Sequence, residues 1–196
     1  RLASGRALAV HVEHGILVRG TSVQSPGAPL EINTVTLGDH GGLIGMCCCP
    51  GRVEQYNDGV HRSRDLAEDL AVVSDWQPDL VISLVELHEF DFLGVAQLPE
   101  EFERRFRWQH HPVRDLAAPS GATGENTVLG EWFASVCRGE RVLLHCAAGL
   151  GRTGTVAARL LMMAGEDADT AIKRVRAARP GTVESGAQEH FLRQSD

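Results

Sequence analysis

The stretch RVLLHCAAGLGRTGTVAARLL, residues 141–161, decides the fold of this protein. It opens with a short apolar run, residues 142–144, that is typical of a buried β-strand, and continues through His145 and Cys146. A loop with two glycines follows, and after it comes a run of good helix formers. The stretch therefore predicts a strand, a tight loop and a helix in direct succession.

Strand-like and helix-like segments alternate along the rest of the chain. Apolar runs predict strands at 30–37, 42–49, 79–85 and 107–113, the first two joined by a turn at 38–41. Apolar residues at helical spacing predict helices at 63–76, with Ser63 as the N-cap, and at 126–138, 152–164 and 168–179. This alternation predicts an α/β fold, with a central, mostly parallel sheet and helices on both of its faces.

The loop between the strand and the helix has the features of an anion site. In mostly parallel sheets, ligands bind where the carboxyl end of a strand passes to a helix, and residues 146–152 occupy that place. Gly149 and Gly151 allow the close approach and the positive φ values that a curled loop requires. Converging backbone N–H groups predict anion contacts from Ala147, Ala148, Gly149, Leu150 and Gly151.

Three side chains at this loop carry chemistry. The positive end of the helix favours the thiolate of Cys146, which is the nucleophilic form of a cysteine. The planar guanidinium of Arg152 can donate two parallel hydrogen bonds to a tetrahedral oxyanion. The hydroxyl of Thr153 is expected near the sulfur, where it would stabilise the sulfur as it leaves in a later step. The pattern favours a phosphate-binding nucleophile over a buried structural thiol.

The spacing C-x5-R-[ST], from Cys146 to Thr153, resembles the signature loop of the cysteine-dependent protein tyrosine and dual-specificity phosphatases. Its position after an apolar strand, with GLGRTG opening a helix, makes the match specific. Segments at 64–70, 84–95, 110–115 and 179–192 are most similar to the cyclin-dependent-kinase-associated phosphatase branch and its bacterial relatives. The resemblance covers residues 30–193, or nearly so.

The resemblance implies hydrolysis of phosphate monoesters through a phosphocysteine intermediate, without a cofactor or a metal. The expected substrates are phosphoproteins or phosphopeptides that carry phosphotyrosine, phosphoserine or phosphothreonine. We expect a shallow, dual-specificity type of site, because the long extra segments of the tyrosine-specific branch have no counterpart here. Polyphosphorylated inositides are disfavoured, since residues 147–150 carry no charge.

The family also uses residues outside the loop. The position that matches its general acid is Asp115, which follows a predicted strand and precedes a loop with a proline and a glycine. Asp91 is a weaker candidate for the acid, because it lies inside an apolar run. Gln188 matches a glutamine that orients water in the second step, although a glutamine on a helix surface is an equal alternative. His145 is expected to hold the loop from the opposite side of the strand to Cys146.

Composition and charge narrow the classes of function. The chain has 196 residues and a formal net charge of −7, which disfavours a broad nucleic-acid interface. No apolar run approaches the ~20 residues that span a bilayer, and charges interrupt the N-terminal stretch, which is atypical of a signal peptide. Arginine makes up all but one of the 19 basic residues, which suggests a GC-rich bacterial genome.

The cysteines and histidines outside the loop predict no further site. Cys47, Cys48 and Cys49 are adjacent, which indicates reduced thiols packed along a strand of a cytoplasmic protein. Neither they nor His110 and His111 have metal-ligand spacing, because adjacent residues of a strand face opposite ways. We therefore expect no metal site and no membrane or nucleic-acid partner.

The chain length favours a single catalytic domain. We expect a phosphatase domain at residues 28–196, preceded by a segment of uncertain status at residues 1–27. Two alternative functions stay open. The first is a phosphoprotein-binding module without turnover, which would normally lose the nucleophile, the arginine or the acid. The second is a sulfur-transfer or arsenate-reducing enzyme with a similar anion loop.

Overall fold

The core of the protein is a mixed sheet of five strands. The computed structural model describes residues 10–13, 16–19, 28–38, 41–55, 61–117 and 123–195. The sheet order is β3 (Asn33–Thr36), β4 (Leu43–Cys48), β9 (Arg141–Cys146), β7 (Leu80–Ser83) and β8 (Trp108–His110). Only the β3–β4 pair is antiparallel, and the other three pairs are parallel. The predicted α/β fold with a mostly parallel sheet is confirmed.

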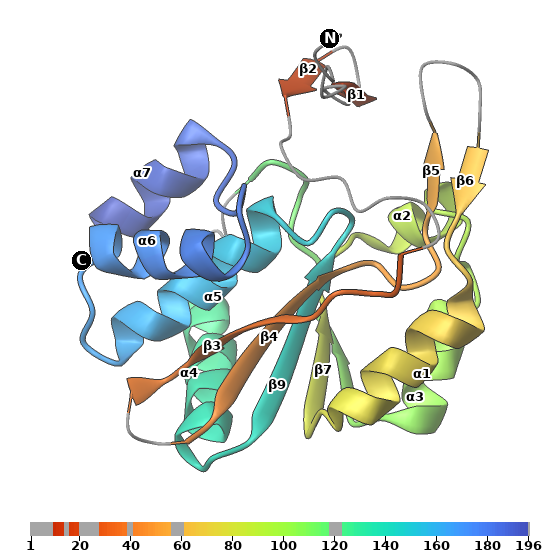
Figure 1. Cartoon of the computed structure of the whole chain (residues 1–196). Helices are drawn as coiled ribbons and strands as arrows, with labels where there is room; N and C mark the ends of the chain where they lie inside the picture. The colour runs from red at the N-terminus through yellow and green to blue at the C-terminus, as the bar shows by residue number, and fades with distance from the viewer. Residues whose placement is uncertain are drawn as a thin grey trace, which may run out of the picture.

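Helices cover both faces of the sheet (Figure 1). On one side lie α4 (Thr123–Cys137), α5 (Gly151–Met163), α6 (Ala168–Ala178) and α7 (Gly186–Gln194). On the other side lie α1 (Leu66–Trp76), α2 (Leu87–Phe92) and α3 (Leu98–Arg105). The predicted helices all form, with ends shifted by a few residues, whereas α2, α3 and α7 were not predicted.

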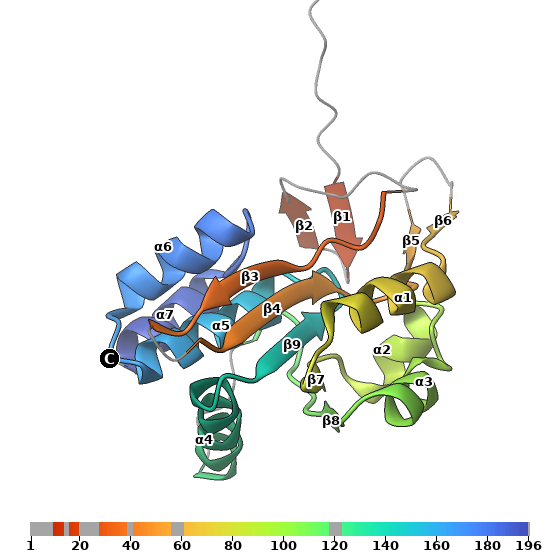
Figure 2. The same ribbon diagram turned by 60° about the horizontal axis from the view of Figure 1, so that its bottom comes forward.

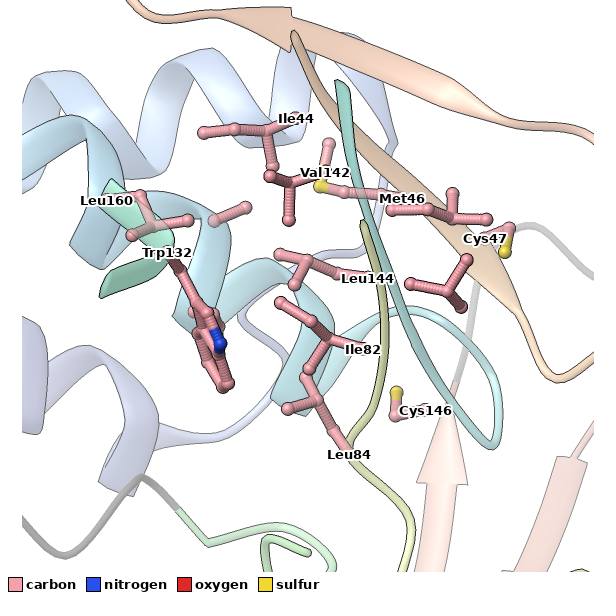
Figure 3. Close-up of a cluster of buried hydrophobic side chains, with 14 of the residues drawn as sticks. Ile44, Met46, Cys47, Ile82, Leu84, Trp132, Val142, Leu144, Cys146 and Leu160 are labelled. Atoms are coloured by element: carbon pink, nitrogen blue, oxygen red, sulfur yellow. The ribbon is translucent and has the colours of Figure 1, made fainter. Parts of the chain in front are cut away.

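The centre of the sheet explains why the quoted stretch is so apolar. Strand β9 lies between β4 and β7, so each face of it meets a layer of helices. Leu144 of β9 is fully buried in one cluster with Ile82 of β7 and Ile44 of β4 (Figure 3). Trp132 of α4 and Leu160 of α5 close this cluster from the helical side. The site-bearing loop therefore starts from a central, buried strand of the sheet.

Two antiparallel hairpins stand apart from the main sheet (Figure 2). One pairs β1 (Val10–Glu13) with β2 (Ile16–Arg19), and the other pairs β5 (Val53–Gln55) with β6 (His61–Ser63). The predicted division of the chain into residues 1–27 and 28–196 stays a prediction. Within the described ranges, no helix is both long and apolar enough to cross a bilayer.

The predicted N-cap of the first long helix is wrong. Ser63 ends strand β6, and Asp65 caps α1 instead, with its carboxylate accepting a hydrogen bond from the Glu68 backbone N–H at 2.9 Å. Both residue types suit an N-cap, so local chemistry alone does not choose between them. The pairing of β5 with β6 draws Ser63 into a strand, and the helix begins after it.

A buried ion pair fixes α1 to the chain that precedes it. The carboxylate of Asp69 is buried in α1 and accepts hydrogen bonds from the Arg64 guanidinium at 2.7 and 2.8 Å. It also accepts a hydrogen bond from the Gly51 backbone N–H at 2.8 Å. These contacts lock the segment after β4 in place.

We expect Asp69→Ala to lower the free energy of unfolding by about 3–5 kcal/mol, because it removes a buried carboxylate that accepts two hydrogen bonds from Arg64 and one from the Gly51 backbone. Chemical denaturation followed by circular dichroism measures the change. Asp75→Ala is the matched control, because Asp75 is an exposed residue of the same helix. Equal stability of the two variants would show that the Asp69 ion pair contributes little.

Candidate active site

The loop after β9 curls tightly against the neighbouring strand. Gly149 has φ +71°, and a Cβ at this residue would lie 2.2 Å from the backbone oxygen of Cys47. Both facts require glycine here. The N–H of Gly149 donates a hydrogen bond to the Sγ of Cys146 at 3.2 Å, so the loop closes around the sulfur. The loop ends at Gly151, where α5 begins.

Two arginines outside the loop hold its carbonyl groups. Arg52 Nη1 donates to the carbonyl oxygen of Ala147 at 2.9 Å. Arg179 donates from Nη2 to Ala148 at 3.1 Å and from Nε to Gly149 at 2.8 Å. Because the N–H and C=O of a trans peptide point in opposite directions, outward carbonyls turn the following N–H groups inward. The two arginines thus orient the backbone N–H groups of the loop so that they can donate to a bound anion.

The guanidinium of Arg152 lies among carboxylates and is almost fully buried, with 2% of its side chain exposed. Its two terminal nitrogens donate to the Glu89 carboxylate at 2.6 and 2.9 Å, and Nη2 lies 3.1 Å from Asp115 Oδ1. Nη1 also donates to the backbone oxygen of Val113 at 3.1 Å. Burial alone would lower the pKa of Arg152, but Glu89, Cys146 and Asp115 outweigh it and raise that pKa above its usual value.

The structure brings Asp115 to the loop. Asp115 follows β8 in a turn, and 40% of its side chain is exposed beside Arg152. Asp91, the other sequence candidate, lies exposed on α2, where its backbone oxygen accepts a hydrogen bond from Gly94. Among the described residues, Asp115 is therefore the candidate acid that contacts the phosphate-loop arginine.

Thr153 carries a buried hydroxyl at the start of α5. It is fully buried in the first turn of α5, and its Oγ1 forms no hydrogen bond within the described part of the chain. A buried hydroxyl without a partner is costly, so such a group is retained where a reacting atom uses it. The predicted role of Thr153 at the sulfur stays a prediction.

His145 belongs to a hydrogen-bond chain that connects the strands β9, β7 and β8. Trp108 Nε1 donates to Ser83 Oγ at 2.8 Å, and Ser83 Oγ lies 2.5 Å from His145 Nε2. The Ser83 hydroxyl accepts from Trp108 and forms its second hydrogen bond with His145, in which the tautomer of the ring decides the direction. Burial lowers the pKa of His145 from its usual 6.5 to about 3, and the charge of Arg152 adds to this effect.

Gln188 is fully buried, which excludes the alternative of a surface glutamine. Its Oε1 accepts hydrogen bonds from the backbone N–H groups of Glu184 at 3.0 Å and Ser185 at 3.2 Å. Its Nε2 donates to the backbone oxygen of Ala117, two residues after Asp115, at 3.3 Å. The predicted role in orienting water stays a prediction.

Several residues of the site were not predicted. Glu89, Arg52 and Arg179 touch the loop or its arginine from segments distant in the sequence. Glu184 is exposed at the mouth of the site, with Oε2 at 2.5 Å from the position a Cβ would take on Gly151. Packing around the Glu184 carboxyl, with the negative charge of Asp115, raises its pKa. These four residues reach the loop or its arginine through the order of the strands in the sheet. No local sequence motif encodes that order.

The remaining cysteines and histidines are accounted for by packing. The five cysteines form no disulfide, and burial raises the pKa values of Cys47, Cys48 and Cys49, which favours protonated thiols. His110 Nε2 lies 2.8 Å from the backbone oxygen of Val85, and the ring of His111 packs edge-on against Trp132. In the described ranges, no cluster of three His, Cys, Asp or Glu residues could hold a metal ion.

Comparisons with known proteins agree with this geometry. A family model described as "Polymorphic toxin system, DSP-PTPase phosphatase" (Tc-R-P) matches residues 59–166. The mouse dual specificity protein phosphatase CDC14B is 38% identical over 88 residues. The match covers 43% of this chain and 17% of CDC14B, so the chain spans less than a fifth of that relative.

Solved structures show the same fold. Kinase-associated phosphatase, with its catalytic-site cysteine replaced by serine, superposes with a TM-score of 0.75 and 22% identity, over 86% of this chain and 95% of that one. Tk-PTP in its active form gives a TM-score of 0.58 and 29% identity, over 77% and 89% of the two chains. With the family match over more than half of its length, the chain belongs to the DSP-PTPase phosphatase family of polymorphic toxin systems.

We expect Arg179→Met to weaken inhibition by vanadate, a phosphate analogue, at least about tenfold, because two charged hydrogen bonds to the loop are lost. Inhibition constants measured at one pH give the change. Arg174→Met is the control, since Arg174 lies on α6 and bonds Glu166 and the Thr36 oxygen instead. Equal constants for the two variants would mean that Arg179 does not shape the loop.

The low pKa of His145 makes stability depend on pH. The unfolded chain takes up a proton at this ring below its usual 6.5, whereas the folded chain does so only near 3. The contribution of His145 is therefore fully present above pH 6.5 and declines towards pH 3, by up to about 1.4 kcal/mol per pH unit. Denaturant titrations at several pH values measure the slope.

His145→Gln removes the titrating ring and should flatten that slope between pH 6 and 4, while all carboxylates still contribute equally to both proteins. Parallel slopes for the two proteins would show that His145 is not held neutral.

Proposed function

We propose that the protein hydrolyses phosphate monoesters of phosphoproteins or phosphopeptides through a phosphocysteine intermediate on Cys146. The observation that carries the proposal is the loop itself. Its carbonyls are bonded outward, the Gly149 N–H donates to the Cys146 sulfur, and Arg152 and Asp115 lie in contact with each other beside it. Membership of the phosphatase family supports the same chemistry.

In the first step, the thiolate of Cys146 attacks phosphorus, and an S–P bond forms as the ester P–O bond breaks. The loop N–H groups and Arg152 hold the other oxygens of the phosphoryl group as charge shifts onto them. Asp115 donates its proton to the leaving oxygen, which departs as a neutral alcohol or phenol. Glu89 keeps Arg152 charged and oriented during this step.

In the second step, water attacks phosphorus and the S–P bond breaks. Asp115, now ionised, accepts a proton from that water, and inorganic phosphate forms. The electron pair of the broken bond returns to the Cys146 sulfur, and the Thr153 hydroxyl donates a hydrogen bond to the thiolate. The free hydroxyl of Thr153 supports this role.

The charges around the site favour singly phosphorylated substrates. Residues 147–150 add no cation, and Glu184 adds a carboxyl group at the mouth of the loop. Substrates with several phosphates would be repelled there, which argues against polyphosphorylated inositides. We assign a dual-specificity site for phosphotyrosine and for phosphoserine or phosphothreonine.

We extend the proposal to the setting in which the protein works. Its clustered reduced thiols suit the cytoplasm, and its preference for arginine over lysine suits a bacterial source. Its net charge of −7 argues against nucleic acid as a partner, and we assign it no membrane partner. The reaction as written needs no cofactor or metal.

Cys146→Ser tests the nucleophile. We expect it to abolish turnover of 4-nitrophenyl phosphate yet keep vanadate or phosphate binding, because the loop donors and Arg152 remain. Steady-state kinetics and calorimetry measure the two properties, with Cys137→Ser on α4 as the control for a lost thiol. A parent protein that binds phosphopeptides without turnover would instead be a binding module.

Asp115→Asn tests the general acid. We expect kcat/KM for phenyl phosphate to fall by about 10²–10⁴-fold, because its basic leaving group needs a proton. Hydrolysis of 4-nitrophenyl phosphate should fall much less, because that oxygen leaves as a stable anion. A uniform loss for both substrates would make Asp115 merely structural, and Asp91 would be tested next.

A further inference from the structure

The turn that carries Asp115 is strained. Leu116, the next residue, has φ +56°, a left-handed conformation that costs a non-glycine residue of the order of 1–2 kcal/mol. Such a conformation persists only where the surroundings hold it. A backbone hydrogen bond from the Ala117 N–H to the Arg114 oxygen, at 3.1 Å, closes the turn.

The start of α7 supplies two further contacts to this turn. Ser185 Oγ donates to the backbone oxygen of Leu116 at 3.1 Å, and Gln188 Nε2 donates to that of Ala117 at 3.3 Å. We propose that Ser185 and Gln188 are positioning residues, which together hold the Asp115 turn in register with the phosphate loop. The inference rests on the proposed function, in which Asp115 is the general acid.

The other hydrogen bonds of Ser185 and Gln188 fix the direction of both contacts. Ser185 Oγ accepts from the Gln188 backbone N–H at 3.1 Å as the N-cap of α7, so its one hydrogen is free for Leu116. Gln188 Oε1 accepts from the backbone N–H groups of Glu184 and Ser185, so its amide can only present hydrogen to Ala117. Neither side chain can make these bonds in reverse.

The same segment also contacts the phosphate loop. The Val183 N–H donates to the backbone oxygen of Leu150 at 3.3 Å. A Cβ on Gly151 would lie 2.5 Å from Glu184 Oε2 and 2.8 Å from Gln188 Nε2, so these side chains pack directly on the loop glycine. Residues 183–188 thus bridge the nucleophile loop and the acid turn.

Loss of these contacts would affect proton donation by Asp115 and not the attack by Cys146. If the turn relaxes, Asp115 moves from the leaving oxygen while Cys146 and Arg152 keep their places on β9 and α5. Proton donation would be lost and nucleophilic attack retained. The loss then grows with the basicity of the leaving group, which a general destabilisation of the fold would not produce.

Two variants remove the Ser185 donor without removing the helix cap. Ser185→Asp keeps a good N-cap acceptor for α7 but has no hydrogen for Leu116, and Ser185→Gly costs the cap only a few tenths of a kcal/mol. Ser195→Gly is the matched control, because Ser195 Oγ donates to the Phe191 oxygen at the far end of the same helix. Melting temperatures confirm that each variant is folded.

The readout is kcat/KM for aryl phosphates of increasing leaving-group basicity, from 4-nitrophenyl to phenyl phosphate. We expect both Ser185 variants to lose at least about tenfold more activity on phenyl than on 4-nitrophenyl phosphate, in the manner of Asp115→Asn. Ser195→Gly should keep the parent ratio. If one Ser185 variant does not fold, the other decides.

The outcomes distinguish a failure of the proposed function from a failure of the positioning role. A parent protein that hydrolyses no aryl phosphate would overturn the proposed function and the inference with it. Leaving-group dependence in Asp115→Asn without any in the Ser185 variants would overturn the positioning role alone. A uniform loss in the Ser185 variants, equal on both substrates, would also overturn it.

Discussion

The outward bonding of the loop carbonyls is the constraint on which the rest of the site depends. Arg52 and Arg179 hold three consecutive carbonyls from residues 147–149, and Gly149 packs against the backbone of β4 at a distance that admits no side chain. Peptide geometry then commits the N–H groups to the side of the sulfur. These backbone dipoles are therefore already oriented in the folded protein, before any anion binds.

Charge balance is the second requirement, and it involves residues far apart in the chain. Arg152 is nearly excluded from water, and a lone buried cation there would be strongly destabilising. Glu89 stabilises it from α2, while Asp115 reaches it from the turn after β8. The same arginine thus links the oxyanion site to the acid, and its position depends on three separate elements of the fold.

The sequence predicted the parts of the site that lie within one motif. The sheet, the loop and the placing of Cys146 beside an anion-binding turn followed from apolar runs, glycines and a specific spacing. Glu89 and Arg179 could not be predicted in this way, because they reach the loop through the order of strands and the packing of α6. Ser63 failed as a cap for a related reason, since its strand pairing overrides its local preference.

Trapping of the covalent intermediate tests the central claim most directly. The protein is mixed with a phosphopeptide labelled with phosphorus-32, denatured within milliseconds at neutral pH, digested and mapped. The account predicts label on the peptide that contains Cys146, formed at least as fast as the product phosphate. Steady turnover with no label on that peptide, or with label on a different side chain, would contradict it.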